Sequence, residues 1–397
     1  MTQTQQLGPH SLAQLEQQVE QILHEARKQG ATACEVGVSA HQGLSVSVRE
    51  QEVESVELIR DQGFSITVYD GQRKGSASTT VAGVDAVRET VSAALAIARH
   101  TSEDECAGLA DAELMAQQLP DLDLWHPWDL SAEQAIALAL ECEAAAFATD
   151  SRISRADGTS LDSEQGCTVY GNSNGFIGGY VGTRHSASCV MIAGEGENMQ
   201  RSYWYDYARK ANDLASMQSI GQRAAERTVS RLGARSIPTC EVPVIFSAEV
   251  ASGFLGHLLA AISGGSLYRK SSFLLDALGQ QLFPDWFTLD ERPLLRGGMA
   301  SSAFDGDGLA TRAKPFVENG RLVSYMLSTY SGRKVGMPST ANSGGARNVF
   351  VTHGAQDQQA LLKQMGRGLL VTELMGQGLN LVTGDYSRGA GGYWVEN

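Results

Sequence analysis

The stretch Glu241–Ser272, EVPVIFSAEVASGFLGHLLAAISGGSLYRKSS, decides how the second half of the chain is interpreted. It begins with an apolar run, Val242–Phe246, which is typical of a short strand. From Ser247 to about Ser263 the spacing predicts a helix, and Glu249 in the first turn suits the positive end of that helix. We therefore predict a strand that leads directly into a helix.

At 100° per residue this helix has two unlike faces. One is an apolar stripe of large side chains: Phe254, Leu255, Leu258, Leu259 and Ile262. The other carries only small residues: Gly253, Gly256, Ala260 and Ser263. Because glycine lowers helix stability, two glycines within one turn indicate that another group approaches the backbone closely. Another strand or an extended ligand would both fit.

The composition describes a soluble globular protein with room for two domains, since 397 residues exceed one ordinary core. The net charge of −14 argues against a large nucleic-acid footprint, and no apolar run is long enough to span a membrane. The first residues lack the pattern of a signal peptide, and the six cysteines are spaced singly. We therefore expect a cytoplasmic protein that binds neither nucleic acid nor membrane.

The first 100 residues are predicted to form a compact α+β unit. A capping-box pattern, Ser11–Gln14, precedes residues at helical spacing, and the period then changes to two along the segment 34–68. Asp70-Gly71 predicts a hairpin turn, and Val84 begins a second helical pattern. Polar residues on one strand face indicate antiparallel strands with helices on the other side.

Residues 125–235 are predicted to repeat this plan after a connecting segment. Another capping box, Ser131–Gln134, opens an alanine-rich helix that runs to about Ala148. Frequent glycine turns over residues 152–209 predict a second antiparallel meander, and Leu214–Leu232 predicts a helix. The segment 1–235 is therefore interpreted as one α+β domain with sub-units of about 1–100 and 125–235.

The segment 239–397 is predicted to be a separate, β-rich and barrel-like domain. Asn319-Gly320 lies between two strand-like runs and predicts a hairpin, and Gln356–Met365 predicts a short helix. Beyond this helix, strand-like runs alternate with many glycines, which suits curved strands. The same glycines would suit an open strand edge that pairs with an extended peptide.

The sequence offers no self-contained catalytic motif. Gly171-Asn-Ser173-Asn-Gly175 matches G-x-S-x-G literally, but it lies between two strand-like runs, where a hairpin turn is the simpler interpretation. No phosphate-binding or dinucleotide loop is found, and no two histidines have the spacing of zinc ligands on a helix. The residues alone therefore describe a folded scaffold.

Several strings, in order along nearly the whole chain, resemble the TldD/PmbA family in its PmbA/TldE branch, which is also called modulator of DNA gyrase. They are Gly75-Ser-Ala-Ser78, His257 with Gly264–Ser271, Thr372–Gly378 and Thr383–Gly389. The resemblance implies an N-terminal α/β portion, a β-rich C-terminal domain and a cytoplasmic TldD/TldE protease for unfolded or peptide substrates. It also implies a link to microcin maturation and antitoxin degradation.

In the TldD type, the resemblance implies an H-E-x-x-x-H zinc motif on the helix of the opening stretch. Its second histidine falls on His257, whereas Ser252 and Gly253 stand where the first histidine and the glutamate would be. A ligand and the general base are thus missing, and we expect His257 to be vestigial. The TldD type also uses a C-terminal cysteine, but no cysteine follows Cys240. Relatives continue beyond Asn397, so the domain 239–397 is expected to lack its last segment.

The resemblance leaves several hypotheses open. The first is a zinc-free subunit, with no cofactor of its own and inactive alone, whose TldD-like partner carries zinc. The second is a stand-alone binding protein without a protease role, either an adaptor or a peptide-holding homodimer. A peptidase with an unrecognised metal site is a third. For peptide contact we predict seven residues: Thr372, Glu373, Gly376, Gly378, Gly384, Asp385 and Gly389.

Overall fold

A computed structural model describes residues 7–396 and divides the chain into two compact units that interleave in sequence. The first unit contains the segments up to Glu113, Leu119–Ser236 and Arg296–Met299. The second contains Leu114–Gln118, Ile237–Leu295 and the residues from Ala300 onward. The short segment 296–299 is tied into the first unit, because Arg209 donates to the carbonyl oxygens of Gly298 and Met299 at 3.0 and 2.9 Å.

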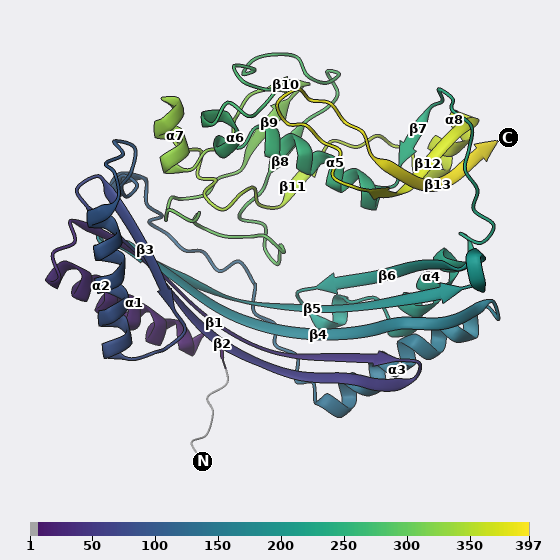
Figure 1. Cartoon of the computed structure of the whole chain (residues 1–397), viewed down its shortest axis with the longest axis horizontal. Coiled ribbons are helices and arrows are strands. Elements are labelled where there is room, and N and C mark those ends of the chain that lie inside the picture. Colours follow the sequence, from purple (N-terminus) through teal and green to yellow (C-terminus); the bar gives the residue numbers. More distant parts are fainter. Residues whose placement is uncertain (1–6, 397) are drawn as a thin grey trace. The chain divides into compact units, whose positions relative to one another are not determined.

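The first unit is built on one six-stranded antiparallel sheet in the order β3-β2-β1-β4-β5-β6 (Figure 1). Its strands are β1 (Ala33–Arg49), β2 (Glu52–Asp70), β3 (Arg73–Thr79), β4 (Ile153–Asn172), β5 (Ile177–Ala193) and β6 (Gln200–Ala208). The predicted hairpin at Asp70-Gly71 is confirmed, since β2 pairs with β3 across it. The two predicted meanders join into a single sheet because β1 pairs with β4 along most of its length.

Four helices cover one face of this sheet: α1 (His10–Lys28), α2 (Val84–His100), α3 (Ala132–Thr149) and α4 (Met217–Val229). The alternate residues Val36, Val38, Val46 and Val48 of β1 are fully buried beneath them. The intervening residues of β1 remain partly exposed. The predicted arrangement of antiparallel strands with helices on one side is therefore confirmed. Short 3-10 helices lie at Ala112–Leu114, Gly196–Asn198 and Ala211–Asp213.

The second unit has shorter strands in two sheets, with orders β10-β9-β8-β11 and β13-β12-β7. The strands are β7 (Val244–Phe246), β8 (Leu289–Glu291), β9 (Lys314–Glu318), β10 (Arg321–Leu322), β11 (Val349–Val351), β12 (Arg367–Met375) and β13 (Gly389–Glu396). Its helices are α5 (Ala248–Ala261), α6 (Gly264–Tyr268), α7 (Thr329–Val335) and α8 (Gln358–Met365). The predicted α+β class is confirmed, although within residues 7–396 neither sheet closes into a barrel.

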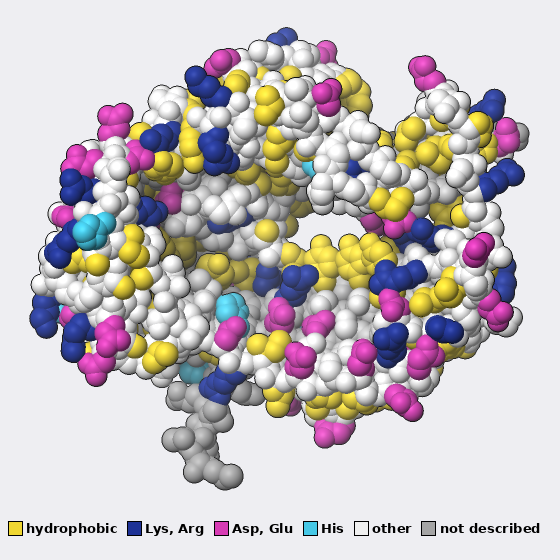
Figure 2. All heavy atoms as spheres, in the orientation of Figure 1, with side chains coloured by type: hydrophobic (Ala, Val, Ile, Leu, Met, Phe, Trp, Pro, Cys, Tyr) yellow, Lys and Arg dark blue, Asp and Glu magenta, His cyan; other side chains and the backbone are white. Residues whose placement is uncertain are grey.

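Charged side chains are mixed on the face of the molecule shown in Figure 2, where acidic and basic groups alternate. That face shows no extended basic surface. In the part of the chain that the structure describes, no helix is both long enough and apolar enough to cross a membrane.

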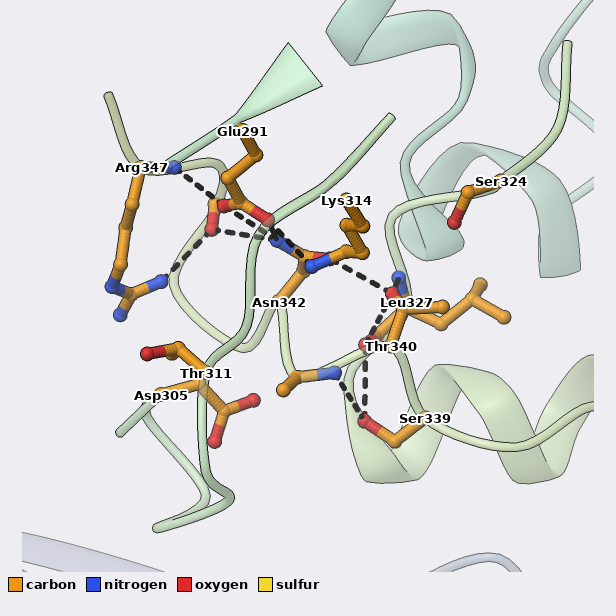
Figure 3. A network of polar contacts seen from close by, with 12 residues as sticks. Glu291, Asp305, Thr311, Lys314, Ser324, Leu327, Ser339, Thr340, Asn342 and Arg347 are labelled. Atoms are coloured by element: carbon orange, nitrogen blue, oxygen red, sulfur yellow. Dashed lines mark hydrogen bonds and ion pairs between the residues drawn. The ribbon is translucent and has the colours of Figure 1, made fainter. Parts of the chain in front are cut away.

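A buried ion pair holds the second unit together (Figure 3). Glu291 of β8 is 1% exposed and forms a salt bridge with Lys314 of β9. The same carboxylate accepts hydrogen bonds from the backbone N–H of Arg347 at 2.6 Å and from the Asn342 side chain at 3.0 Å. These contacts satisfy both carboxylate oxygens, so the pair ties β8 and β9 to the loop before β11.

A second buried carboxylate, Asp305, organises the neighbouring loops. Its oxygens accept backbone N–H bonds from Asp307 and Leu309, each at 3.0 Å, and from Ser343 at 2.9 Å. Burial, with the Asp307 carboxylate nearby, raises the pKa of Asp305 to about 6. Both buried carboxylates are occupied with holding backbone and partner side chains, which is a structural role.

Candidate functional site

The predicted strand-to-helix transition is confirmed in the second unit. β7 pairs in parallel with β12, with Val244 opposite Leu369 and Phe246 opposite Val371. The backbone N–H of Ser247 then donates to the carbonyl oxygen of Val371 at 2.9 Å, and α5 begins at the next residue. The start of α5 is therefore fixed against β12, the strand that carries two of the predicted peptide-contact residues.

The small-residue face of α5 is open. A Cβ atom built on Gly253 or Gly256 would have no heavy atom of another part of the described chain within 4 Å. Phe254 between them is 43% exposed, and Ala261 is the single buried residue of the helix. Within residues 7–396, no strand packs on these two glycines. The close backbone approach that the sequence predicted is therefore not observed within the described chain.

His257 lies in a small aromatic group. Its ring centroid is 6.3 Å from that of Phe254 and 5.7 Å from that of Tyr386, and the latter two rings are 5.1 Å apart. The Tyr386 hydroxyl is shielded from solvent and has no hydrogen-bond partner among the described residues. The environment of His257 is thus made of aromatic rings on α5 and on the loop between β12 and β13.

The residues around His257 do not fit a zinc ion. A catalytic zinc takes three protein ligands, and along α5 one turn before His257 the chain offers a serine and a glycine. The Ser252 hydroxyl donates to the carbonyl oxygen of Glu249 at 2.8 Å, and Gly253 has no side chain. Within residues 7–396, no three His, Cys, Asp or Glu side chains are grouped as a metal site requires.

The predicted peptide-contact residues fall on β12, β13 and the loop between them. Thr372 lies at an irregularity in the β12–β13 register, Glu373 lies opposite Gly391, and Gly389 lies opposite Met375. Gly376 directly follows β12, has a φ of +84° and faces open space. The β12–β13 pair therefore places three of the predicted residues along one ladder.

Two more of the predicted residues share a pocket of about 390 Å³ in this loop. Its lining is Gln377, Gly378, Leu379, Asn380, Asp385, Tyr386 and Ser387. Gly378 is required there, because a Cβ atom would lie 1.4 Å from the carbonyl oxygen of Ser387. Asp385 accepts from the Thr383 hydroxyl at 2.7 Å. Gly384 lies outside the lining and packs on the ring of Phe273.

The structure thus brings Gly378 and Asp385 together and joins their pocket to His257 through Tyr386, which both lines the pocket and contacts the histidine ring. Sequence reasoning did not single out Tyr386 or Phe254 as site residues. The available signal was weak: Tyr386 is the aromatic residue within the glycine-containing string Thr383–Gly389. The peptide-contact assignment itself stays a prediction.

Family models match three consecutive parts of this architecture. The PmbA/TldA metallopeptidase domain 1 matches residues 34–98, the central domain matches 125–232 and the C-terminal domain matches 239–397. This chain belongs to the PmbA/TldD family. Membership accounts for the order of the family strings and for the class of fold.

Named members of the PmbA/TldD family align over nearly the whole chain. The metalloprotease PmbA homolog of Haemophilus influenzae is 49% identical over 385 residues, which are 97% of this chain and 85% of the relative. Metalloprotease PmbA of Escherichia coli O157:H7 is 50% identical over 363 residues, which are 91% of this chain and 81% of the relative. This chain is therefore similar to proteins that are named as metalloproteases.

Solved structures of the family share the fold. A Bacteroides thetaiotaomicron protein described as a modulator of DNA gyrase superposes with a TM-score of 0.92 at 27% identity, covering 98% of this chain and 88% of the other. TldE from Thermococcus kodakarensis gives a TM-score of 0.78 at 19% identity, covering 94% and 89%. The second likeness concerns the fold alone.

Proposed function

We propose that this chain is the zinc-free subunit of a two-subunit cytoplasmic metallopeptidase of the PmbA/TldD type. A TldD-like partner would supply the zinc, the general base and the catalytic water, and the substrates would be unfolded or peptide-like chains. The observation that carries the proposal is α5, where Ser252 and Gly253 replace two residues of the metal motif and His257 contacts aromatic rings.

The residues of α5 support this division of labour chemically. Neither Ser252 nor Gly253 can act as the carboxylate base that a metal-activated water requires, and a single imidazole binds zinc weakly. No catalytic step is therefore assigned to this chain. Its contribution would be to hold the substrate and to orient the partner. This is expected of a subunit that has the helix but lacks a metal ligand and the general base.

Peptide contact is proposed for the β12–β13 ladder and the loop pocket. Thr372, Glu373 and Gly389 lie on the ladder, Gly376 follows it, and Gly378 and Asp385 line the pocket. Edges poor in side chains can pair with the backbone of many sequences, because the hydrogen bonds do not depend on the side chain. Substrates of varied sequence would then be accepted.

The decisive experiment measures zinc content and peptidase activity of the purified chain, alone and mixed with a TldD-like protein. The expected result is a stoichiometric complex that binds zinc through the partner and cleaves an unfolded substrate, with neither property in this chain alone. One tightly bound zinc per chain together with activity alone would overturn the proposal. Peptide binding by this chain without any complex would favour the stand-alone adaptor.

The peptide-contact assignment has its own test in Gly389→Val. A Cβ atom at this position would lie 3.5 Å from the nearest atom, so the side chain fits without rebuilding the fold. Turnover of a peptide by the complex is expected to fall by about tenfold, because the branched side chain would stand on the sheet face and narrow the space for the side chains of a bound peptide. Gly354→Val, in open space on a loop, is the matched control and should leave turnover unchanged.

A further inference from the structure

The first half of β2 has a free edge. β1 pairs with β2 from Glu52 to Tyr69, but β3 pairs on the other side only with Phe64–Asp70. Along residues 52–62, hereafter the β2 edge, no strand of the described chain occupies the outer side (Figure 1). This edge therefore presents a row of backbone N–H and C=O groups that another strand could pair with.

Apolar side chains line one face of the β2 edge. Val53, Val56 and Leu58 are 48%, 42% and 82% exposed. Their partners across the ladder on β1 are Val48, Val46 and Leu44, which belong to the core beneath α3 and α4. These three side chains therefore extend the apolar surface of the core beyond the area that the helices cover.

The charge of the β2 edge indicates which kind of strand could bind there. Glu52, Glu54, Glu57 and Asp61 are accompanied by one basic residue of the same segment, Arg60. If two copies of this chain paired through the edge, their carboxylates would be brought together, and like charges across neighbouring strands are destabilising. The acidic edge therefore disfavours its own copy and favours a cationic strand.

We propose that the β2 edge binds an extended segment of a partner protein in which apolar residues alternate with Lys or Arg. The segment would add to the sheet as a seventh strand. Its apolar residues would pack on Val56 and Leu58, and its basic residues would lie on the opposite face, beside Glu57 and Asp61. The site involves no residue of α5 or the β12–β13 ladder, so it stands independently of the proposed peptidase role.

The first test is binding of a fluorescent peptide, Lys-Val-Lys-Val-Lys-Leu-Lys-Val, to the whole chain, followed by fluorescence anisotropy at low and high salt. Saturable binding that weakens with salt is expected, and the acidic counterpart with Glu for Lys should not bind. Glu57→Lys and Leu58→Lys should each weaken binding by about tenfold. Glu89→Lys on α2 and Ile97→Lys, 48% exposed on the same helix, are the matched controls and should bind normally.

A second test asks whether the backbone is used. Two versions of the peptide are prepared, N-methylated at either the odd or the even residues. In an added strand, alternate N–H groups point toward the edge, so one version should lose binding and the other should keep it. Equal binding of both versions would overturn strand addition. Failure to bind the cationic peptide, together with dimers that Leu58→Lys disperses, would instead assign the edge to a second copy.

Discussion

Helices α3 and α5 are both apolar and rich in small residues, yet their surroundings are opposite. α3 buries residues on successive turns, among them Ala135, Ala139 and Cys142, whereas α5 buries Ala261 alone. The glycine that faces α3 is used for close contact: a Cβ atom on Gly221 of α4 would lie 1.9 Å from the carbonyl oxygen of Cys142. Nothing in the described chain approaches Gly253 or Gly256 in this way.

A glycine within a helix therefore has two different explanations in this molecule. Gly221 lowers the intrinsic stability of α4 but allows two helix backbones to meet. The glycines of α5 carry the same intrinsic cost without any packing within the described chain that offsets it. A helix that faces a substrate or a partner, as proposed above, would give these glycines a role.

The cores of the two units also differ in their buried ionisable groups. The core of the first unit is apolar side chains between one sheet and four helices, with Glu143 and His185 among its buried ionisable groups. The core of the second unit depends on Glu291 and Asp305, each 1% exposed. The second unit should therefore be sensitive to a change of charge at either of these two carboxylates.

The largest expected effect is from Glu291→Gln. The amide would leave Lys314, whose side chain is 12% exposed, without a counter-charge, so the second unit should lose about 3 to 5 kcal/mol. Amide hydrogen exchange measured by mass spectrometry reports the two units separately, and the loss should be confined to the second. Asp290→Asn breaks an exposed pair with Arg292 and should cost less than about 1 kcal/mol. Equal losses in the two variants would contradict the role given to Glu291.

The next effect is a pH dependence that has opposite signs in the two units. The pKa of Asp305 is raised from 3.8 to about 6, so the folded second unit binds the proton more tightly than the unfolded chain. The contribution of Asp305 to the free energy of unfolding of the second unit should therefore fall by up to about 3 kcal/mol as the pH rises from about 4 to 6. Burial lowers the pKa of His185 below 6.5, so the first unit should instead weaken as the pH falls through that value.

Hydrogen exchange as a function of pH checks both signs. Asp305→Asn should remove the corresponding pH dependence from the second unit alone, and His185→Gln should do so in the first unit alone. His185 makes hydrogen bonds of 3.0 Å with the Ser163 hydroxyl and with the carbonyl oxygen of His126, and the Gln side chain retains both kinds of partner. A pH response that is unchanged in these variants would rule out the two groups as its source.

The smallest effects compare the glycines directly. Gly221→Ala should cost the first unit about 2 kcal/mol, because the added methyl group must push α3 and α4 apart. Gly253→Ala should raise the stability of α5 by up to about 1 kcal/mol, because alanine favours the helix and the site is open. Urea unfolding combined with hydrogen exchange measures both. Destabilisation by Gly253→Ala would show that α5 is packed on that face.

Local chemistry made much of the fold predictable. Ser131 forms the predicted capping box with Gln134, and Asn319-Gly320 joins β9 and β10 as predicted. The turn between β1 and β2 was missed, because Glu50 and Gln51 adopt φ of 52° and 61° without the usual Asn or Gly. The carboxylate of Glu143 stabilises this turn by accepting from the Gln51 backbone at 2.6 Å, a contact 92 residues apart in sequence.

Tertiary contacts also explain the other failures. The predicted capping box at Ser11 is wrong: α1 has Pro9 at its N-cap, and the Ser11 hydroxyl accepts from the Gly8 backbone instead. At the candidate site, the strand-to-helix turn was predictable from spacing, whereas His257 was singled out by the resemblance to the family. The contact of Tyr386 with His257 was not predictable, because it depends on how the loop between β12 and β13 folds back over α5.

The interleaving of the two units has a consequence for synthesis of the chain on the ribosome. The segment Arg296–Met299 belongs to the first unit, where the N–H of Gly297 donates to the carbonyl oxygen of Leu122 at 2.7 Å. The first unit therefore cannot be completed when its sheet has emerged, and must wait until a long stretch of the second unit has been translated. Domains generally fold as units during synthesis, but here completion of the first unit waits for a segment that is translated after Ile237–Leu295. A gene fragment that ends after Ser236 would encode the complete sheet and an incomplete unit.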